Sequence, residues 1–311
     1  MTIRLTRRQV LRSALMLGGS GLAFGAYASW VEPRFRLAIR EYRISPSGWP
    51  AGLRLTAAFI SDLHASEPYM STQRIAGIVE TTNALKPDII LLGGDYCGGA
   101  INKPFIGPAT VAPILADLHA PLGRHAIFGN HDHNIGIASV RRAFAVGRIP
   151  TLENAVTRIE TEAGAFWLAG TASALAYWLR RGGESGPEER PIVTIHGRRF
   201  RGADDLPGTL AKITDDAPVL LLAHEPDQFA QVPERVALTF SGHTHGGQVY
   251  IPGIGRPFVP SLYGERYAYG HIVEKGRHLV VSGGLGLSFL PVRALCPPEI
   301  TLVRISASFA A

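Results

Sequence analysis

The chain has 311 residues, 46% hydrophobic and 18% charged, a composition that excludes a disordered polyelectrolyte and is sufficient for a large buried core. The formal net charge of +6 comes from residues 1–43, which hold eight arginines against two glutamates, so basic and acidic residues balance in the rest of the chain. A nucleic-acid partner would need a basic surface on the folded body, and we therefore expect no nucleic acid.

The first residues have the layout of an export signal. The pair Arg7-Arg8 precedes an uncharged run over residues 13–30, and "TRRQVL" resembles a twin-arginine motif. Residues 26–28, "AYA", offer a cleavage site, whereas the arginines that follow suit an uncleaved anchor at a membrane surface. We expect residues 1–31 to be a signal or signal-anchor that directs the chain to the bacterial inner membrane or the periplasm. Residues 32–311 are expected to form one domain.

The spacing of apolar residues predicts strands and helices in alternation, and then mostly strands. Strands are expected at residues 35–44, 53–60, 88–94, 125–130, 165–175, 191–197, 217–223, 235–241, 278–286 and 299–306. Helices are expected at residues 73–85, before Pro87, and at residues 140–147, ending at Gly147. Residues 180–191 are expected to be a surface loop. This order is typical of an α/β protein whose sheets are covered by helices.

Five of the apolar runs end in side chains of the kinds that bind metal ions. In chain order these are Asp62 with His64, then Asp95, then Asn130 with His131 and Asp132, then His224, and finally His243 with His245. Loops at the carboxyl ends of strands gather at one edge of an open sheet, so we expect these side chains to meet there. Glycines beside them, as in "GGD" and "SGHTHGG", allow the backbone to turn sharply.

Each of these segments has an ordinary explanation when it is taken alone. A single aspartate after a strand is usually a helix cap, and two alternating histidines are more often surface or core residues than ligands. Five such segments in one chain favour the alternative, that their side chains form one metal site. Four histidines, two aspartates and one asparagine exceed the needs of one metal ion and suit two ions that share a carboxylate.

The blocks "SDLH", "GGDY", "GNHD", "AHEPD" and "SGHTHGGQ" resemble, in that order, the calcineurin-like metallophosphoesterases. The later stretch "VPSLYGERYAYG" resembles the membrane-associated branch of YaeI-like and YkuE-like bacterial phosphodiesterases. The resemblance implies an α/β fold, a four-layer sandwich of two mixed β-sheets flanked by α-helices. It also implies a binuclear metal centre in which Asp62, His64 and His245 hold one ion, Asn130, His224 and His243 hold the other, and Asp95 bridges them. The branch often has asparagine where this chain has Glu225.

The resemblance further implies a reaction, the attack of metal-bound hydroxide on a phosphodiester or pyrophosphate bond. His131 would face the substrate and assist the leaving oxygen, and Asp132 would orient the His131 ring. Mixed nitrogen and oxygen ligands are compatible with two ions of Mn, Fe, Co or Zn, so the identity of the metal stays open.

The Pro/Gly-rich segment 251–270 directly follows the last ligands. It is either an ordinary surface loop or a rim that meets the substrate. In the second case Arg256 or Arg266 would contact phosphate, and Tyr263 or Tyr267 would stack on a base or a sugar.

The leading hypothesis is therefore a metal-dependent phosphoesterase, specifically a phosphodiesterase. The membrane-linked signal suits a lipid-linked substrate, and the family resemblance then implies a narrower hypothesis, a UDP-2,3-diacylglucosamine pyrophosphatase-type hydrolase of lipid A synthesis. A third hypothesis, a non-catalytic scaffold with the same fold, is disfavoured because such scaffolds typically lose ligands and this set is complete. The oligomeric state is left open.

Overall fold

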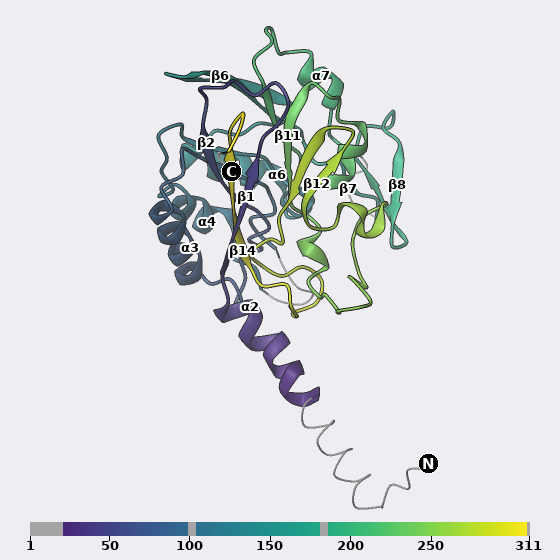
Figure 1. The fold of residues 1–311 in the computed structure, drawn as a ribbon. Coiled ribbons are helices and arrows are strands. Elements are labelled where there is room, and N and C mark those ends of the chain that lie inside the picture. The colour runs from purple at the N-terminus through teal and green to yellow at the C-terminus, as the bar shows by residue number, and fades with distance from the viewer. Residues whose placement is uncertain (1–20, 99–103, 181–185, 310–311) are drawn as a thin grey trace, which may run out of the picture.

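The computed structural model describes residues 21–98, 104–180 and 186–309, so Arg7 and Arg8 of the expected signal lie outside it. Two mixed β-sheets face each other, and helices cover their outer sides (Figure 1). The α/β architecture that the family resemblance implied is confirmed.

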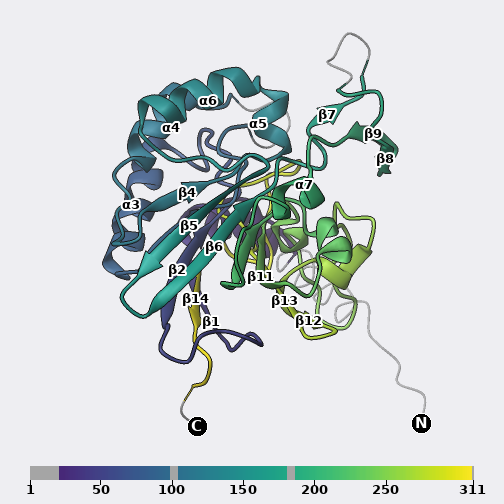
Figure 2. The same cartoon turned by 90° about the horizontal axis from the view of Figure 1, so that it is seen from above.

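The first sheet has five strands in the order β1-β14-β2-β3-β4. These strands are β1 (Ala38–Ile44), β14 (Glu299–Ile305), β2 (Leu55–Ile60), β3 (Ile89–Leu92) and β4 (Arg124–Ala126). Strands β2, β3 and β4 are parallel, so their carboxyl ends lie at the same edge. Helices lie along the outer face of this sheet (Figure 2), namely α3 (Thr72–Ala84), α4 (Pro108–Leu115) and α6 (Ile137–Val146).

The second sheet has six strands in the order β12-β13-β11-β10-β6-β5. These strands are β12 (Gly270–Glu274), β13 (Arg277–Val281), β11 (Val236–Ser241), β10 (Val219–Leu222), β6 (Gly164–Gly170) and β5 (Ala155–Thr161). The four central strands are parallel, whereas β12 and β5 pair as antiparallel edges. The outer face packs against two short helices, α7 (Leu206–Leu210) and η2 (Pro226–Gln231).

Apolar side chains fill the three spaces between these four layers. Between the two sheets, the rings of Phe59 and Phe240 lie 5.5 Å apart, centroid to centroid. Phe144 of α6 is buried against the first sheet, and Phe229 of η2 is buried against the second. Strands β3 and β10 are buried along their whole length, which is why their sequences are continuous apolar runs without alternation.

A third, small sheet was not expected from the sequence. It has the order β7-β9-β8 and stands apart from the main sheets (Figure 2). Its strands are β7 (Tyr177–Trp178), β9 (Arg198–Arg201) and β8 (Ile192–Ile195). Leu175, Ile195 and Phe200 form a separate apolar cluster under this sheet. Only residues 191–197 had been predicted to contain a strand here.

The N-terminal helix leaves the body as a projecting arm (Figure 1). Residues 21–26 are helical and continue into η1 (Tyr27–Val31) and α2 (Glu32–Phe35). Its base is fixed because the buried Glu32 carboxylate accepts hydrogen bonds from the amides of Leu295 (3.1 Å) and Cys296 (2.7 Å). Within the described residues, no helix has both the length and the apolar character needed to cross a membrane.

Candidate metal centre

Each predicted ligand lies just beyond the carboxyl end of a main-sheet strand. In the first sheet, Asp62 and His64 follow β2, Asp95 follows β3, and Asn130 begins the short helix α5 (Asn130–Asn134) after β4. In the second sheet, His224 follows β10, and His243 and His245 follow β11. Six of these seven side chains are buried, and His243 is half-buried. The structure therefore brings the predicted ligands together at one edge of the sandwich.

The backbone is strained where these residues lie. Left-handed φ angles occur at Asp62 (56°), His64 (45°), Asp95 (56°), His243 (67°) and His245 (53°). Residues with a Cβ atom avoid this region at a cost of roughly 1 kcal/mol or more each. Backbone hydrogen bonds hold the turns, including Asp62 N to Gly94 O and His64 N to Asp95 O, both 3.0 Å. Several strained residues side by side are typical of a functional site.

Asp62, His64 and His245 form the first group of potential ligands. The Nε2 atoms of His64 and His245 lie 3.0 Å apart, and His245 Nε2 lies 3.5 Å from Asp62 Oδ1. The Asp62 carboxylate also accepts hydrogen bonds from the His243 amide, at 3.0 and 3.1 Å. The loop after β11 is thereby tied to the loop after β2.

Asp95, His224 and His243 form another group, and His64, Asp95 and His131 also lie close enough together to share an ion. Hydrogen bonds to carbonyl oxygens fix the tautomers of the His224 and His243 rings, because a carbonyl only accepts. His224 Nδ1 donates to Gly93 O (2.7 Å), which leaves Nε2 as the atom that faces Asp95 Oδ2, at 3.2 Å. His243 Nε2 donates to Pro260 O (3.0 Å), which leaves the Nδ1 lone pair 2.9 Å from Asn130 Oδ1.

Asp95 lies between the two groups. Its Oδ2 is 3.6 Å from His64 Nε2 on one side and 3.2 Å from His224 Nε2 on the other. Its Oδ1 accepts a hydrogen bond from the His131 amide at 2.8 Å. This central place is the one expected for a bridging carboxylate.

Burial dominates the electrostatics of the cluster. Burial raises the pKa of Asp62 to about 6 and lowers the pKa of His243 to about 4. Burial likewise holds the pKa of His64 and His245 well below the usual value, so these rings are neutral. Neutral imidazoles keep their lone pairs for a metal ion.

Asp95 and His224 behave as a pair. Burial alone would raise the pKa of Asp95, but His224 and His131 hold it well below its usual range. Burial alone would lower the pKa of His224, but the Asp95 carboxylate raises it well above its usual value. In the protein without metal, this pair therefore shares a proton that a cation would replace.

The residues present fit a pair of divalent cations. His224 Nε2 is buried and faces Asp95 Oδ2 at 3.2 Å, so a cation can take the place of the proton between them. Asn130 Oδ1 and His243 Nδ1 present lone pairs to each other at 2.9 Å, an arrangement that a cation between them satisfies. The mixed set of carboxylate, amide and imidazole ligands is compatible with divalent transition metals.

His131 and Asp132, the two predicted catalytic residues, have different surroundings. The half-buried His131 ring lines a cavity beside the cluster, edge-on to His64 with ring centroids 4.7 Å apart. The buried Asp132 carboxylate instead accepts hydrogen bonds from backbone amides, those of Asp95 (2.7 Å), Tyr96 (3.0 Å) and Gly129 (3.0 Å). Asp132 therefore positions the loop that carries Asp95. Its carboxylate is not aimed at the His131 ring as the sequence had led us to expect.

Two glycines allow the loops to approach closely. A Cβ atom on Gly129 would lie 2.2 Å from Asp95 Oδ1 and 2.6 Å from His224 Nε2. A Cβ atom on Gly94 would lie 2.5 Å from the Gly129 amide nitrogen, and the left-handed φ of Gly94 (96°) also favours glycine. The ligands can gather only because these positions lack side chains.

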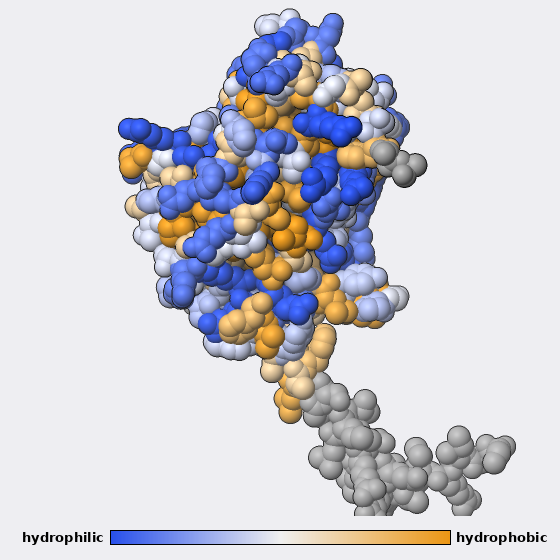
Figure 3. Space-filling model, turned by 60° about the vertical axis from the view of Figure 1, so that its left-hand side comes forward, coloured by the Kyte–Doolittle hydropathy of each residue, from blue (hydrophilic) through white to orange (hydrophobic). Residues whose placement is uncertain are grey.

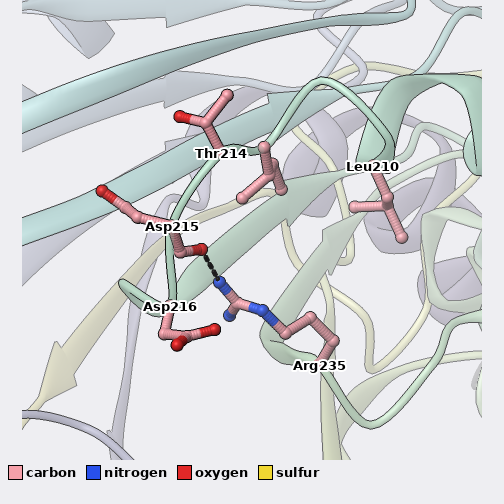
Figure 4. A pocket seen from close by; sticks show the side chains of 6 residues that line it. Leu210, Thr214, Asp215, Asp216 and Arg235 are labelled. Atoms are coloured by element: carbon pink, nitrogen blue, oxygen red, sulfur yellow. Dashed lines mark hydrogen bonds between the residues drawn. The ribbon is translucent and has the colours of Figure 1, made fainter.

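A cavity of about 740 Å³ opens beside the cluster. The predicted site residues in its wall are Asp95, Asn130, His131, His243 and His245. A second hollow of about 330 Å³ includes Leu210, Asp215 and Arg235 (Figure 4). There Arg235 donates to the backbone carbonyls of Asp215 (2.8 Å) and Ala217 (2.7 Å), and none of the predicted ligands lines it. The larger cavity is therefore the candidate substrate-binding site.

The structure does not place the four predicted substrate contacts in this cavity. The Arg256 guanidinium donates to Gly246 O and stacks over the Tyr250 and Tyr269 rings. Arg266 forms two hydrogen bonds with Glu274 (2.7 and 2.8 Å), and the Tyr267 hydroxyl donates to the same carboxylate (2.9 Å). The half-exposed Tyr263 packs on Tyr267, with ring centroids 5.1 Å apart. These side chains hold their own loop together.

Sequence reasoning missed Arg293, which is fully buried beside the cluster. Its guanidinium donates to the carbonyls of Gly283 (2.9 Å), Gly286 (2.7 Å) and Cys296 (2.9 Å) and lies 3.2 Å from His245 Nδ1. Arg293 thereby links the stretch 283–286, Cys296 and the His245 ring. A lone arginine within the apolar stretch "LPVRALC" was the available signal.

Glu225 stands where the branch that this chain resembles often has asparagine. The buried carboxylate binds the Ser173 hydroxyl (2.5 Å) and the Ala174 amide (2.8 Å). It therefore ties the loop after β10 to the loop after β6, next to His224.

Comparisons with known proteins identify the family of this chain. The family model of the calcineurin-like phosphoesterases matches residues 55–247. The metallophosphoesterase YkuE of Bacillus subtilis is 30% identical over 98% of this chain and 99% of its own, and the phosphodiesterase YaeI of Escherichia coli is 29% identical over 97% and 99%. A dimetal phosphatase of known structure from Danio rerio is 12% identical, with a TM-score of 0.43 over 76% of this chain and 88% of that chain. The chain belongs to the calcineurin-like phosphoesterase family.

Proposed function

We propose that this protein hydrolyses a phosphodiester or pyrophosphate bond with two divalent metal ions held by the seven predicted ligands. The observation that carries the proposal is the convergence of two ligand groups on the shared carboxylate of Asp95. Asp62, His64 and His245 would hold one ion, and Asn130, His224 and His243 the other.

Two cations bound here would offset the charge of the phosphoryl oxygens and make water a better nucleophile near neutral pH. The protein's own side chains supply the charge balance and the proton donor. Asp95 balances positive charge at the centre, and the neutral imidazoles add none of the negative charge that would repel phosphate. His131, which lines the cavity, is placed to give a proton to the leaving oxygen.

The test uses the full chain, loaded with Mn²⁺, and bis(p-nitrophenyl) phosphate as substrate. We expect hydrolysis that a chelator abolishes and added metal restores. Loss of a group that only supports a ligand typically costs about 10–100-fold, so Asp95→Asn and His243→Ala should each lower kcat/KM by more than about 100-fold. Asp216→Asn, at an exposed site in the second hollow, is the matched control and should leave kcat/KM unchanged. A folded, metal-loaded protein without hydrolysis would instead support the scaffold hypothesis.

A narrower candidate is cleavage of the pyrophosphate of UDP-2,3-diacylglucosamine. The apolar part of the cavity wall favours a lipid-linked substrate. Release of UMP from this substrate by wild type and not by Asp95→Asn would support it. Activity on simple diesters without any on this substrate would exclude it.

We also propose that the N-terminal segment holds the enzyme at a membrane surface of the cell envelope after twin-arginine export. Large apolar side chains on the N-terminal arm are exposed, including Leu22 (78%) and Phe24 (53%). Figure 3 shows hydrophobic surface, in orange, where the arm leaves the body. Retention of the segment is favoured because the Ala28 carbonyl accepts a hydrogen bond from the Arg293 amide (2.9 Å). Cleavage after Ala28 would remove that contact.

Fractionation of cells that express the full chain with a C-terminal tag tests this location. We expect an uncleaved chain in the membrane fraction, accessible to protease from the periplasmic side. Replacement of Arg7 and Arg8 by lysine should leave the chain protected in the cytoplasm. A shortened, freely soluble periplasmic product would contradict retention.

A further inference from the structure

The cavity beside the metal centre has an apolar wall that takes no part in the attack on phosphorus. Its apolar members come from the small third sheet and from two loops, and they include Trp178, Ile195, Phe200, Phe258, Phe289 and Leu290. The volume of about 740 Å³ lies within the range of roughly 300–1,000 Å³ that is typical of ligand pockets. A phosphoryl group and two metal ions need only the polar end.

Aromatic rings line this wall as stacked pairs. Phe258 stacks on Phe289 with centroids 5.8 Å apart and planes 27° apart, and on His196 at 4.5 Å and 22°. Trp178 stacks on Phe200 at 6.4 Å and 28°. Phe258 is 42% exposed and Leu290 is 56% exposed, so the apolar surface continues from the cavity to the outside of the molecule.

Two polar side chains in the same wall, Gln248 and His196, already form hydrogen bonds within the protein. The Gln248 amide donates to Leu290 O (2.9 Å) and Val292 O (3.0 Å) and accepts from the Ser288 amide (2.7 Å). His196 Nε2 bonds Val259 O at 3.1 Å. A nucleobase would find these hydrogen-bonding groups occupied, whereas a hydrocarbon chain needs none of them.

We propose that this wall binds a hydrocarbon chain of the substrate, so that the enzyme prefers amphiphilic phosphodiesters with an alkyl or acyl chain on one side of the phosphate. The proposal rests on the proposed function, because it places the phosphate of the same substrate at the metal cluster. The Arg198 guanidinium of β9 lies over the Trp178 and Phe289 rings at 5.0 and 4.7 Å, and this contact joins the small sheet to the loop that carries Phe289.

A series of p-nitrophenyl alkyl phosphodiesters, from methyl to hexyl, tests the proposal below micelle-forming concentrations. Water attacks phosphorus and the bond to the nitrophenyl oxygen breaks, which gives p-nitrophenol and an alkyl phosphate. Each methylene that enters the wall should raise kcat/KM about threefold, chiefly through KM. Equal kcat/KM for methyl and hexyl substrates would overturn the proposal and leave the proposed function intact. A lack of hydrolysis of every diester would overturn the proposed function.

Variants locate the site. Phe289→Ala and Trp178→Ala should each lower kcat/KM for the hexyl substrate about tenfold or more and change that for the methyl substrate less than about twofold. The methyl substrate thus reports whether each variant is folded. Val146→Ala, at an 82% exposed position outside the cavity, is the control and should leave the hexyl preference unchanged. A hexyl preference that survives both cavity substitutions would show that the chain binds elsewhere and would overturn the assignment.

The chain could come from a membrane lipid or from a soluble amphiphile. A hexadecyl p-nitrophenyl phosphodiester held in phosphatidylcholine vesicles distinguishes the two sources. Hydrolysis of this vesicle-borne substrate supports the proposal with a membrane source. A hexyl preference without hydrolysis of the vesicle-borne substrate supports it with a soluble source.

Discussion

Replacement of Asp132 by asparagine separates two roles for this carboxylate. One Asp132 oxygen accepts from the Asp95 and Gly129 amides, and the other accepts from the Tyr96 amide. Asparagine can keep the first oxygen, but it turns its NH₂ group toward the Tyr96 N–H. One hydrogen bond to a charged acceptor is lost, at about 1.5–3 kcal/mol, and buried donors are left without an acceptor, at about 1–3 kcal/mol more.

The expected loss of stability is therefore about 4 kcal/mol, which for a domain of this size is a fall in Tm of roughly 8 °C. Thermal unfolding should be measured with chelator present, so that bound metal does not contribute to Tm. Asp216→Asn is the exposed control. If Asp132→Asn lost activity with an unchanged Tm, the carboxylate would be acting on His131 and our positioning argument would be refuted.

Three further predictions concern the cluster and its support. Gly129→Ala should abolish metal binding, because the new Cβ atom would lie 2.2 Å from Asp95 Oδ1. Metal content after gel filtration measures this loss. Gly52→Ala is the control and should bind metal normally, because a Cβ atom there has no neighbouring atom within 4 Å. Metal binding near pH 7 should release about one proton, because the raised pKa of His224 keeps this ring protonated until a cation replaces the proton. Metal affinity should therefore rise with pH. Calorimetry in Hepes and in Tris measures the release, and equal heats of binding in the two buffers would show that no proton leaves. Arg293→Met should lower Tm by about 5 °C or more, because the buried Gly283 and Gly286 carbonyls lose their hydrogen-bond donor. An unchanged Tm would show that water replaces the guanidinium as the donor.

The metal cluster could be predicted because its signal is local. Each ligand follows an apolar run, and a buried parallel strand is the structure that such a run favours. Asp95, for example, comes three residues after β3 ends at Leu92. Once the strands are parallel, their carboxyl ends meet, and the long-range convergence follows from topology.

The substrate contacts could not be predicted because their signal is not local. Arg266 looked free in the loop, but Glu274 on β12 pairs with it through two hydrogen bonds. The small third sheet escaped prediction because β7 has two residues and β8 and β9 have four each, too few for a clear period. Phe200 and Phe289, in distant segments, become one wall only in the folded chain.

The metal centre and the apolar wall are built from different parts of the molecule. The ligands stand on the main sheets, where β3 and β10 are buried along their whole length. The wall stands on the small sheet and on loops, with Phe258 and Leu290 partly exposed. A substitution in the wall therefore has few ways to reach the strained backbone at Asp62 or Asp95. The division predicts that changes in the small-sheet part of the wall alter which ester is cleaved and leave metal binding intact, whereas changes at the strand ends abolish both.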